Sequence, residues 1–139
     1  MDEKELQEKI MTYRLLEARL DSLVKQRDVL INRLIELQST LQSIDEIEKS
    51  DEDILFPIGS NAFKSAKIVS KDKMIVEIGA NVALEKSAEE GKVIINRRKD
   101  EIEGLINQIQ DEIQKISVAV NQLGPELQEM ANKLQKQAG

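Results

Sequence analysis

Residues 102–134 read IEGLINQIQDEIQKISVAVNQLGPELQEMANKL, and this stretch decides the fold. Apolar residues recur in it at alternating intervals of three and four, which is the heptad pattern of a helix that packs along one seam against another helix. Ser87 and Glu90 stand at the spacing of a capping box, so we expect one coiled-coil helix over residues 88–136. Its seam positions, none of them polar, are Ile102, Ile106, Ile109, Ile113, Ile116, Val120, Leu123, Leu127, Met130 and Leu134.

The N-terminal third repeats this pattern, and we expect a second helix over residues 3–48. Lys9 and Arg27 are polar members of its seam, and a single polar seam residue often fixes the alignment of two helices at a cost in stability. We assign that role to Arg27, which we expect to face the neighbourhood of Ile113. Two helices of similar length around a short middle segment predict an antiparallel pair, in which facing residue numbers sum to about 140. The apolar seam positions of this first helix are Leu6, Tyr13, Leu16, Leu20, Leu23, Leu30, Leu34, Leu37, Leu41 and Ile44.

Between the helices the apolar period changes to two, and Ile, Val and Phe become frequent, which predicts strands. Gly59-Ser-Asn61 and Gly79-Ala-Asn81 supply turn material, and Pro57 is expected to end the first strand. The expected fold class is therefore α+β, mainly α: a long antiparallel two-helix coiled coil with two β-hairpins between the helices. The strands are expected over residues 54–56, 63–69, 74–78 and 82–85.

The composition excludes most kinds of catalytic site. Because the 139 residues include no Cys and no His, disulfides, thiol nucleophiles, zinc fingers and imidazole chemistry are excluded. The glycine spacing of a phosphate-binding loop is missing, and Asp51-Glu-Asp53 lacks the glycine and distal glutamate of a calcium loop. We expect no catalytic residue, no cofactor, no metal and no enzyme activity.

The charge and hydropathy exclude two kinds of partner. A net charge of -6 argues against nucleic acid, and the basic cluster Arg97-Arg98-Lys99 is interpreted as a solvated helix face. No apolar run approaches the ~20 residues that cross a membrane, and the first twenty residues lack the pattern of a signal peptide. We therefore expect a cytoplasmic protein with no membrane and no nucleic-acid partner.

The middle segment, residues 54–86, predicts an oligomer. Isolated two-stranded ribbons are marginally stable in water, and their edges are open, so we expect these hairpins to complete a sheet or an oligomeric β-barrel with hairpins of other subunits. A monomeric cap, in which the hairpins fold back onto the helix bases, stays open as an alternative. The residues expected to make the assembly contacts are Ile54, Phe56, Ile58, Phe63, Ile68, Met74, Val76, Ile78 and Val82.

The residues around the turns carry a family resemblance. Ile54-Leu-Phe-Pro-Ile-Gly-Ser-Asn-Ala-Phe63, followed by Met74-Ile-Val-Glu-Ile-Gly-Ala-Asn-Val-Ala-Leu-Glu-Lys-Ser87, resembles the Pro-Ile-Gly and Gly-x-x-x-x-x-Glu-Lys/Arg-Ser patterns of the α class of the prefoldin family. That class has two hairpins between its helices, and the β class has one. The resemblance spans the whole chain in architecture, so we assign residues 1–139 to a single prefoldin-like domain, and its simplicity favours an archaeal source.

The resemblance implies a partner set and a mechanism. Two copies of the α-class chain assemble with four β-class subunits into a hexamer whose coiled coils extend from paired β-barrels. Unfolded polypeptides are held between the coiled-coil tips without ATP and are passed to a group II chaperonin. The implied function is that of a chaperone subunit, a holdase.

The candidate site lies at the tips, because in an antiparallel pair both chain ends lie at the distal end. Methionine there is suited to contacts of many shapes, since its side chain is flexible and polarizable. Packing in the seam is the competing interpretation for these residues, and for Met11 an isolated outward side chain needs no function. The candidate substrate-binding residues are Leu6, Ile10, Met11, Leu127, Met130 and Leu134.

Two rival functions and one local question stay open. A structural coiled-coil adaptor would bind a folded partner helix, and a nucleotide-exchange factor for another chaperone would need a folded ATPase. Gly124-Pro125 falls inside the second helix, opposite Leu15 and Leu16 by the expected pairing, and departs from the family pattern. Since the seam stays in phase across this pair, we expect a kinked but continuing helix, which either splays the tip or is a tolerated bend.

Overall fold

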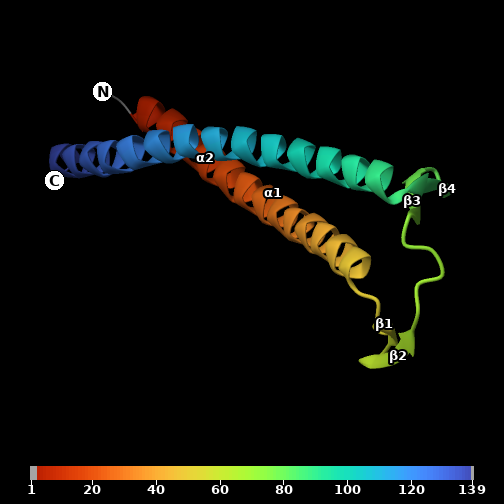
Figure 1. Cartoon of the computed structure of the whole chain (residues 1–139). Coiled ribbons are helices and arrows are strands. Elements are labelled where there is room, and N and C mark those ends of the chain that lie inside the picture. The colour runs from red at the N-terminus through yellow and green to blue at the C-terminus, as the bar shows by residue number, and fades with distance from the viewer. Residues whose placement is uncertain (1–2, 139) are drawn as a thin grey trace. The chain divides into compact units, whose positions relative to one another are not determined.

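Two long helices flank two small hairpins in the computed structural model, which describes residues 3–138. In chain order the elements are α1 (Glu3–Lys49), β1 (Ile54–Gly59), β2 (Ala62–Ala66), β3 (Lys73–Gly79), β4 (Val82–Ser87) and α2 (Ala88–Ala138) (Figure 1). This order confirms the predicted α+β, mainly α, class with two hairpins between two helices. The described residues form two separate two-stranded sheets and no closed barrel, so the oligomeric barrel stays a prediction.

The chain divides into two compact units. The first comprises residues 1–32 and 104–139, and the second comprises residues 33–103. Each unit holds a stretch of α1 and a stretch of α2, and the hairpins belong to the second unit.

In the first unit the two helix stretches run antiparallel. Lys9 pairs with Glu126 at 2.5 Å and Arg19 pairs with Glu112 at 2.9 Å, so the numbers fall along α2 as they rise along α1. The start of α1 and the end of α2 consequently lie at the same end of this unit (Figure 1). Tyr13 lies against Gly124, which corrects the expectation that Leu15 and Leu16 would face it. In the first unit, the numbers of facing residues therefore sum to less than 140.

The predicted seams are buried. Every apolar seam position of both helices is buried or half-buried, and the side chains of Leu23, Leu37 and Ile106 are almost fully covered. Lys9 and Arg27, the polar seam members, are also half-buried. Removing one such stripe from water is what stabilises helices this long, because helix propensity alone contributes little.

In the second unit the helix stretches share a small core. Leu37, Ile44 and Ile95 are buried together, with Leu41, Met74 and Ile102 packed against them. Ile95 stands seven residues before Ile102, so the seam of α2 starts at least one heptad earlier than predicted. The same heptad count, continued backwards, would have found it.

The two hairpins use the same turn. Ser60 and Asn61 have φ of 49° and 62°, and Ala80 and Asn81 have identical values. Positive φ at both central residues is the type I′ turn, whose twist matches that of the flanking strands and which favours Asn. The sequence repeats accordingly: Ile-Gly-Ser-Asn leads into the turn of the first hairpin, and Ile-Gly-Ala-Asn leads into the turn of the second.

The expected ends of all four strands differ from the structure, and those of β1 and β2 were wrong by three residues. β1 continues past Pro57 to Gly59, with Pro57 opposite Phe63, because each strand of a two-stranded ribbon is an edge where the missing N–H is tolerated. β2 ends at Ala66, and Val69, expected inside the strand, is fully exposed.

The helix ends and the Gly-Pro pair behave largely as predicted. The Ser87 hydroxyl accepts a hydrogen bond from the Glu90 amide at 3.1 Å, as a helix cap should. At the end of α1, the Lys71 ammonium donates to the Ser50 carbonyl and pairs with Asp51. α2 continues through Pro125 to Ala138, which confirms the expectation of a continuing helix.

Candidate functional site

The six predicted tip residues all lie in the first unit, near the start of α1 and the end of α2. Met130 is 3% exposed and therefore packs between the helices. Met11 is 66% exposed and is the one member of the six that points to solvent. Half-burial describes the rest: Leu6, Ile10, Leu127 and Leu134.

The tip has a weak point in α2. Gly and Pro are less favourable than Ala in a helix interior by about 1 and about 3 kcal/mol respectively. Residues 126–138, which follow Gly124-Pro125, are no longer than the ~12–15 residues at which an isolated helix is marginal in water. Burial of seam side chains such as Met130, worth about 1.5–3 kcal/mol when complete, therefore keeps this last stretch helical.

Contacts with α1 surround the weak point. A Cβ built on Gly124 would lie 3.5 Å from Cε2 and 3.6 Å from Oη of Tyr13, so the tyrosine ring covers the glycine at contact distance. Two residues later, the Lys9 ammonium donates to Glu126 Oε1 at 2.5 Å. This hydrogen bond to Glu126 raises the pKa of Lys9 above its ordinary value, since it favours the charged amine.

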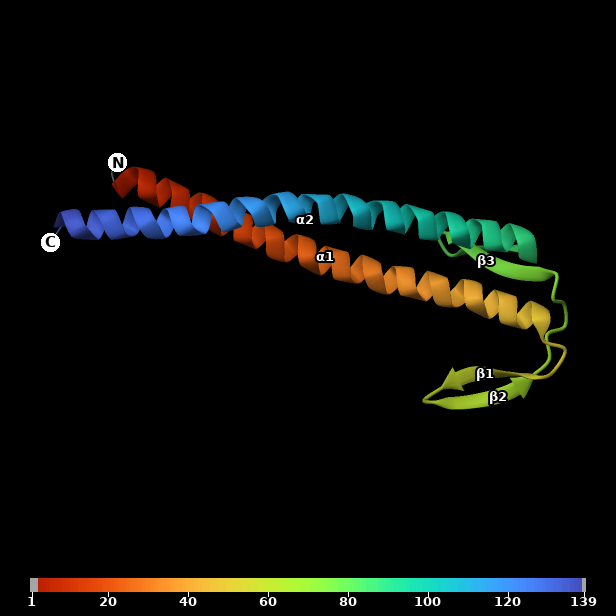
Figure 2. The ribbon, with the colours of Figure 1, turned by 60° about the vertical axis from the view of Figure 1, so that its left-hand side comes forward.

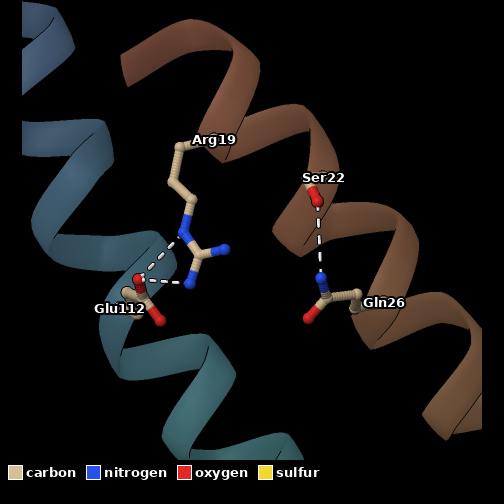
Figure 3. Close-up of polar contacts among 4 residues, drawn as sticks. All are labelled: Arg19, Ser22, Gln26 and Glu112. Atoms are coloured by element: carbon tan, nitrogen blue, oxygen red, sulfur yellow. Dashed lines mark hydrogen bonds and ion pairs between the residues drawn. The ribbon is translucent and has the colours of Figure 1, made fainter. Parts of the chain in front are cut away.

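Farther from the chain ends, a second ion pair joins the helices. Glu112 Oε1 accepts hydrogen bonds from Nε and Nη2 of Arg19, at 3.2 and 2.9 Å (Figure 3). The neighbouring Gln26 amide instead donates to the Ser22 hydroxyl within α1, at 3.3 Å. Arg19 and Glu112 are both about half exposed, so this pair contributes little to stability.

Arg27 occupies its seam position as expected. Its Nε is buried with no hydrogen-bond partner, and its Nη2 lies 3.5 Å from Asp28 on the same helix. A buried donor without a partner costs about 1–3 kcal/mol. The cost in stability expected for Arg27 therefore has a structural source, whereas its role in aligning the helices stays a prediction.

The predicted assembly residues of the first hairpin lie on both faces of the ribbon. Ile54 and Phe56 are half-buried and line, with Ile47 of α1, a cavity of about 540 Å³. Ile58 and Phe63 are mostly exposed. Ile68, which follows β2, is half-buried.

The second hairpin packs on the start of its own helix, where β3 lies beside α2 (Figure 2). Val76 is buried, and the Met74 side chain fills the space beside Gly91. Arg98 Nη2 donates to the Glu77 carbonyl at 2.6 Å. β3 therefore folds back onto the start of its own helix, whereas Ile78 and Val82, the remaining predicted assembly residues, are about half exposed. The monomeric cap and the oligomeric barrel both stay predictions.

Three exposed apolar residues on the hairpins were not among the predicted assembly residues. They are Leu55, Ile75 and Leu84, with exposures of 66, 76 and 41%. The signal was present, because apolar residues fill successive positions in these strands and so must appear on both faces. A ribbon that is apolar on both faces is covered on one face at most by its own chain.

Among residues 3–138, no group of acidic residues is arranged to hold a metal ion. Within the same range, the helices are too polar to span a lipid bilayer.

Comparisons with known proteins agree with this architecture. The prefoldin subunit family matches residues 16–133. Prefoldin subunit alpha of Pyrococcus horikoshii is 28% identical over 133 residues, which cover 94% of this chain and 90% of the relative. Prefoldin subunit alpha of Methanococcus aeolicus is 33% identical over 101 residues, or 71% of this chain and 70% of the relative.

Solved structures share the fold. A filamentous PFD from Methanocaldococcus jannaschii, determined by cryo-electron microscopy, superposes with a TM-score of 0.69 at 21% identity, covering 86% of this chain and 98% of that chain. The crystal structure of the prefoldin beta subunit from Thermococcus strain KS-1 gives a TM-score of 0.63 at 13% identity, covering 91% of both chains. With two helices, two hairpins and a family match over most of its length, this chain belongs to the prefoldin family, and its curated archaeal relatives are α subunits.

Proposed function

We propose that this chain is the α-class subunit of an ATP-independent holdase, which captures unfolded polypeptides at coiled-coil tips and delivers them to a group II chaperonin in the cytoplasm. Membership of the prefoldin family supports a chaperone-type subunit, and the family is consistent with the expected absence of enzyme activity. The observation that carries the proposal is the tip itself, where apolar side chains from the two ends of the chain meet on two adjacent helices.

The chemistry of the tip suits a binder of unrelated clients. Met11 and Met130 contribute flexible, polarizable side chains that adapt to many apolar shapes. Each contact is weak, but several tips around one client raise the effective concentration of each next contact. Affinity then comes from the number of tips engaged, and no nucleotide is consumed.

The hairpins support assembly into a hexamer of two α-class and four β-class subunits. Ile75 on β3 and Leu55 on β1 are about two-thirds exposed or more, and both ribbons have open edges that can pair with other strands. A monomer with such edges would be prone to aggregation, so strands from β-class subunits are the natural cover. The assembled barrels would leave the tips free.

Aggregation assays test this proposal. The chain, mixed with a β-class subunit from the same cell, should suppress aggregation of several unrelated denatured proteins without ATP. A variant lacking residues 1–14 and 125–139 should assemble normally, as judged by its mass in solution, and should lose most of that protection.

Two results would contradict the proposal. Unchanged protection by the truncated assembly would move client capture away from the tip. Protection of no client, together with tight binding of one folded helix, would favour the coiled-coil adaptor instead.

A further inference from the structure

We propose that the tip is a closed client site that opens at Gly124-Pro125, with the Lys9–Glu126 ion pair as its latch. This inference rests on the proposed function and concerns the control of the same site. Opening moves residues 126–138 of α2 away from α1 and uncovers the apolar side chains on both.

The burial of the tip requires a step before binding. Met130 is 3% exposed, so a client cannot contact it while the helices stay paired. Leu127 and Leu134, one turn away on either side, are half-buried in the same seam. Only Met11 offers a client a mostly exposed apolar side chain among the six tip residues in the closed form.

The sequences of the two helices indicate that the end of α2, and not α1, moves when the tip opens. Pro125 cannot donate the hydrogen bond that the Asn121 carbonyl would receive in a regular helix, and Gly124 adds no side-chain packing of its own. α1 contains neither Gly nor Pro. Local opening follows the least stable stretch of a structure, so the end of α2 separates while α1 stays helical.

The contacts around the break act as a latch. Lys9 holds Glu126 directly after the proline, and Tyr13 covers Gly124 directly before it. Lys9 and Tyr13 lie on consecutive turns, so a single stretch of α1 contacts α2 on both sides of Pro125. Beyond it, Lys133 pairs with Glu129 inside α2 and does not tie the end to α1.

A cleavable cross-link tests the opening directly. The chain has no native Cys, so Lys9→Cys with Glu126→Cys gives two thiols that a flexible, reducible bismaleimide can join. In the assembled complex, cross-linking should reduce client protection at least fivefold, and reduction of the linker should restore it in the same sample. Because one molecule is compared before and after cleavage, misfolding cannot account for the change.

The matched control uses another inter-helix ion pair of the first unit, Arg19 with Glu112. Arg19→Cys with Glu112→Cys places the same linker before the Gly-Pro break, where the helices are expected to remain together. Protection should stay within twofold of the uncross-linked value. Equal loss at both positions would overturn the inference, since the site of opening would then not be Gly124-Pro125.

Hydrogen exchange provides an independent measurement. Amides of residues 126–138 should exchange at least tenfold faster than those of residues 106–120. The double variant Gly124→Ala, Pro125→Ala should remove most of that difference in exchange rate and should suppress client aggregation less well. Lys9→Gln should instead increase the exchange rate of the amides after Pro125.

The two proposals fail differently. If the Gly124→Ala, Pro125→Ala variant exchanges more slowly but suppresses client aggregation as well as the wild type, the latch is wrong and the proposed holdase function is unaffected. If the wild-type complex protects no client while the exchange pattern is as expected, the proposed function fails.

Discussion

Met74 occupies the space that a side chain at Gly91 would need. The thioether of β3 therefore lies directly against the backbone of α2, and the adjoining Val76 is buried by the same docking. The Arg98 hydrogen bond to the Glu77 carbonyl holds the other end of β3. These contacts position the second hairpin within its own chain, so the proposed assembly would meet a preformed ribbon.

Alanine substitutions at Gly91 and Gly104, two of the three glycines in α2, should change stability in opposite directions. Gly91→Ala forces Met74 to move, and we expect a loss of about 1–3 kcal/mol in the free energy of unfolding. Gly104→Ala meets nothing within 4 Å, so it should add up to about 1 kcal/mol through helix propensity alone. Urea denaturation followed by circular dichroism measures both. In a Met74→Ala background Gly91→Ala should become stabilising, and a persistent loss there would contradict the packing explanation.

An alkaline transition should depend on Lys92. Hydrogen bonds to Glu48, and then to Asp45, raise the pKa of Lys92 above 10.5, and partial desolvation opposes them. A raised lysine pKa stabilises the fold fully below pH 10.5, and this contribution disappears as the pH rises through the folded-state value. Lys92→Met should therefore lower Tm by a constant amount near neutrality, and the difference should shrink above pH 10.5. Lys115→Met serves as the control for a lost surface charge.

Met11 should matter for clients and little for folding. It is 66% exposed, so Met11→Ser should change the free energy of unfolding by no more than about 0.5 kcal/mol. The same change should reduce aggregation suppression, because the closed tip loses its outward apolar contact. Val29→Ser is a matched control at 68% exposure on the same helix, away from the tip. Equal loss with both variants would point to a general effect of surface hydrophobicity.

Replacing Arg27 should stabilise the chain and loosen its alignment. Arg27→Leu removes the unpaired buried Nε and fills the seam, so we expect a gain of about 1–3 kcal/mol in the free energy of unfolding. Arg33→Leu, at an exposed position, should change it by no more than about 0.5 kcal/mol. To test alignment, one cysteine replaces Lys9 and a second is placed at each of several α2 positions in turn. In the Arg27→Leu variant, the Lys9→Cys thiol should cross-link to more of these positions than it does with Arg27 present. An unchanged cross-link pattern would remove the alignment role from Arg27.

The two heptad seams, the helix cap at Ser87 and the number of hairpins followed from the sequence, because each depends on neighbours within one or two turns of the chain. The positions of the two turns also followed from the sequence, because Gly59-Ser-Asn61 and Gly79-Ala-Asn81 are typical turn residues, whereas the type I′ geometry came from the structure. The end of β1 was misplaced because proline was taken as a stop, whereas an edge strand accepts it.

The amino-acid pattern by itself determined that this chain forms two amphipathic helices with two hairpins between them, since periodicity and turn preference are properties of adjacent residues. Tertiary structure decided that Met130 is buried while Met11 is exposed, that Tyr13 covers Gly124, and that Met74 fills the place beside Gly91. Burial and contact between distant residues depend on how far one helix is shifted along the other and on which face a ribbon docks. A heptad repeat leaves that shift ambiguous, because moving by one repeat preserves the seam.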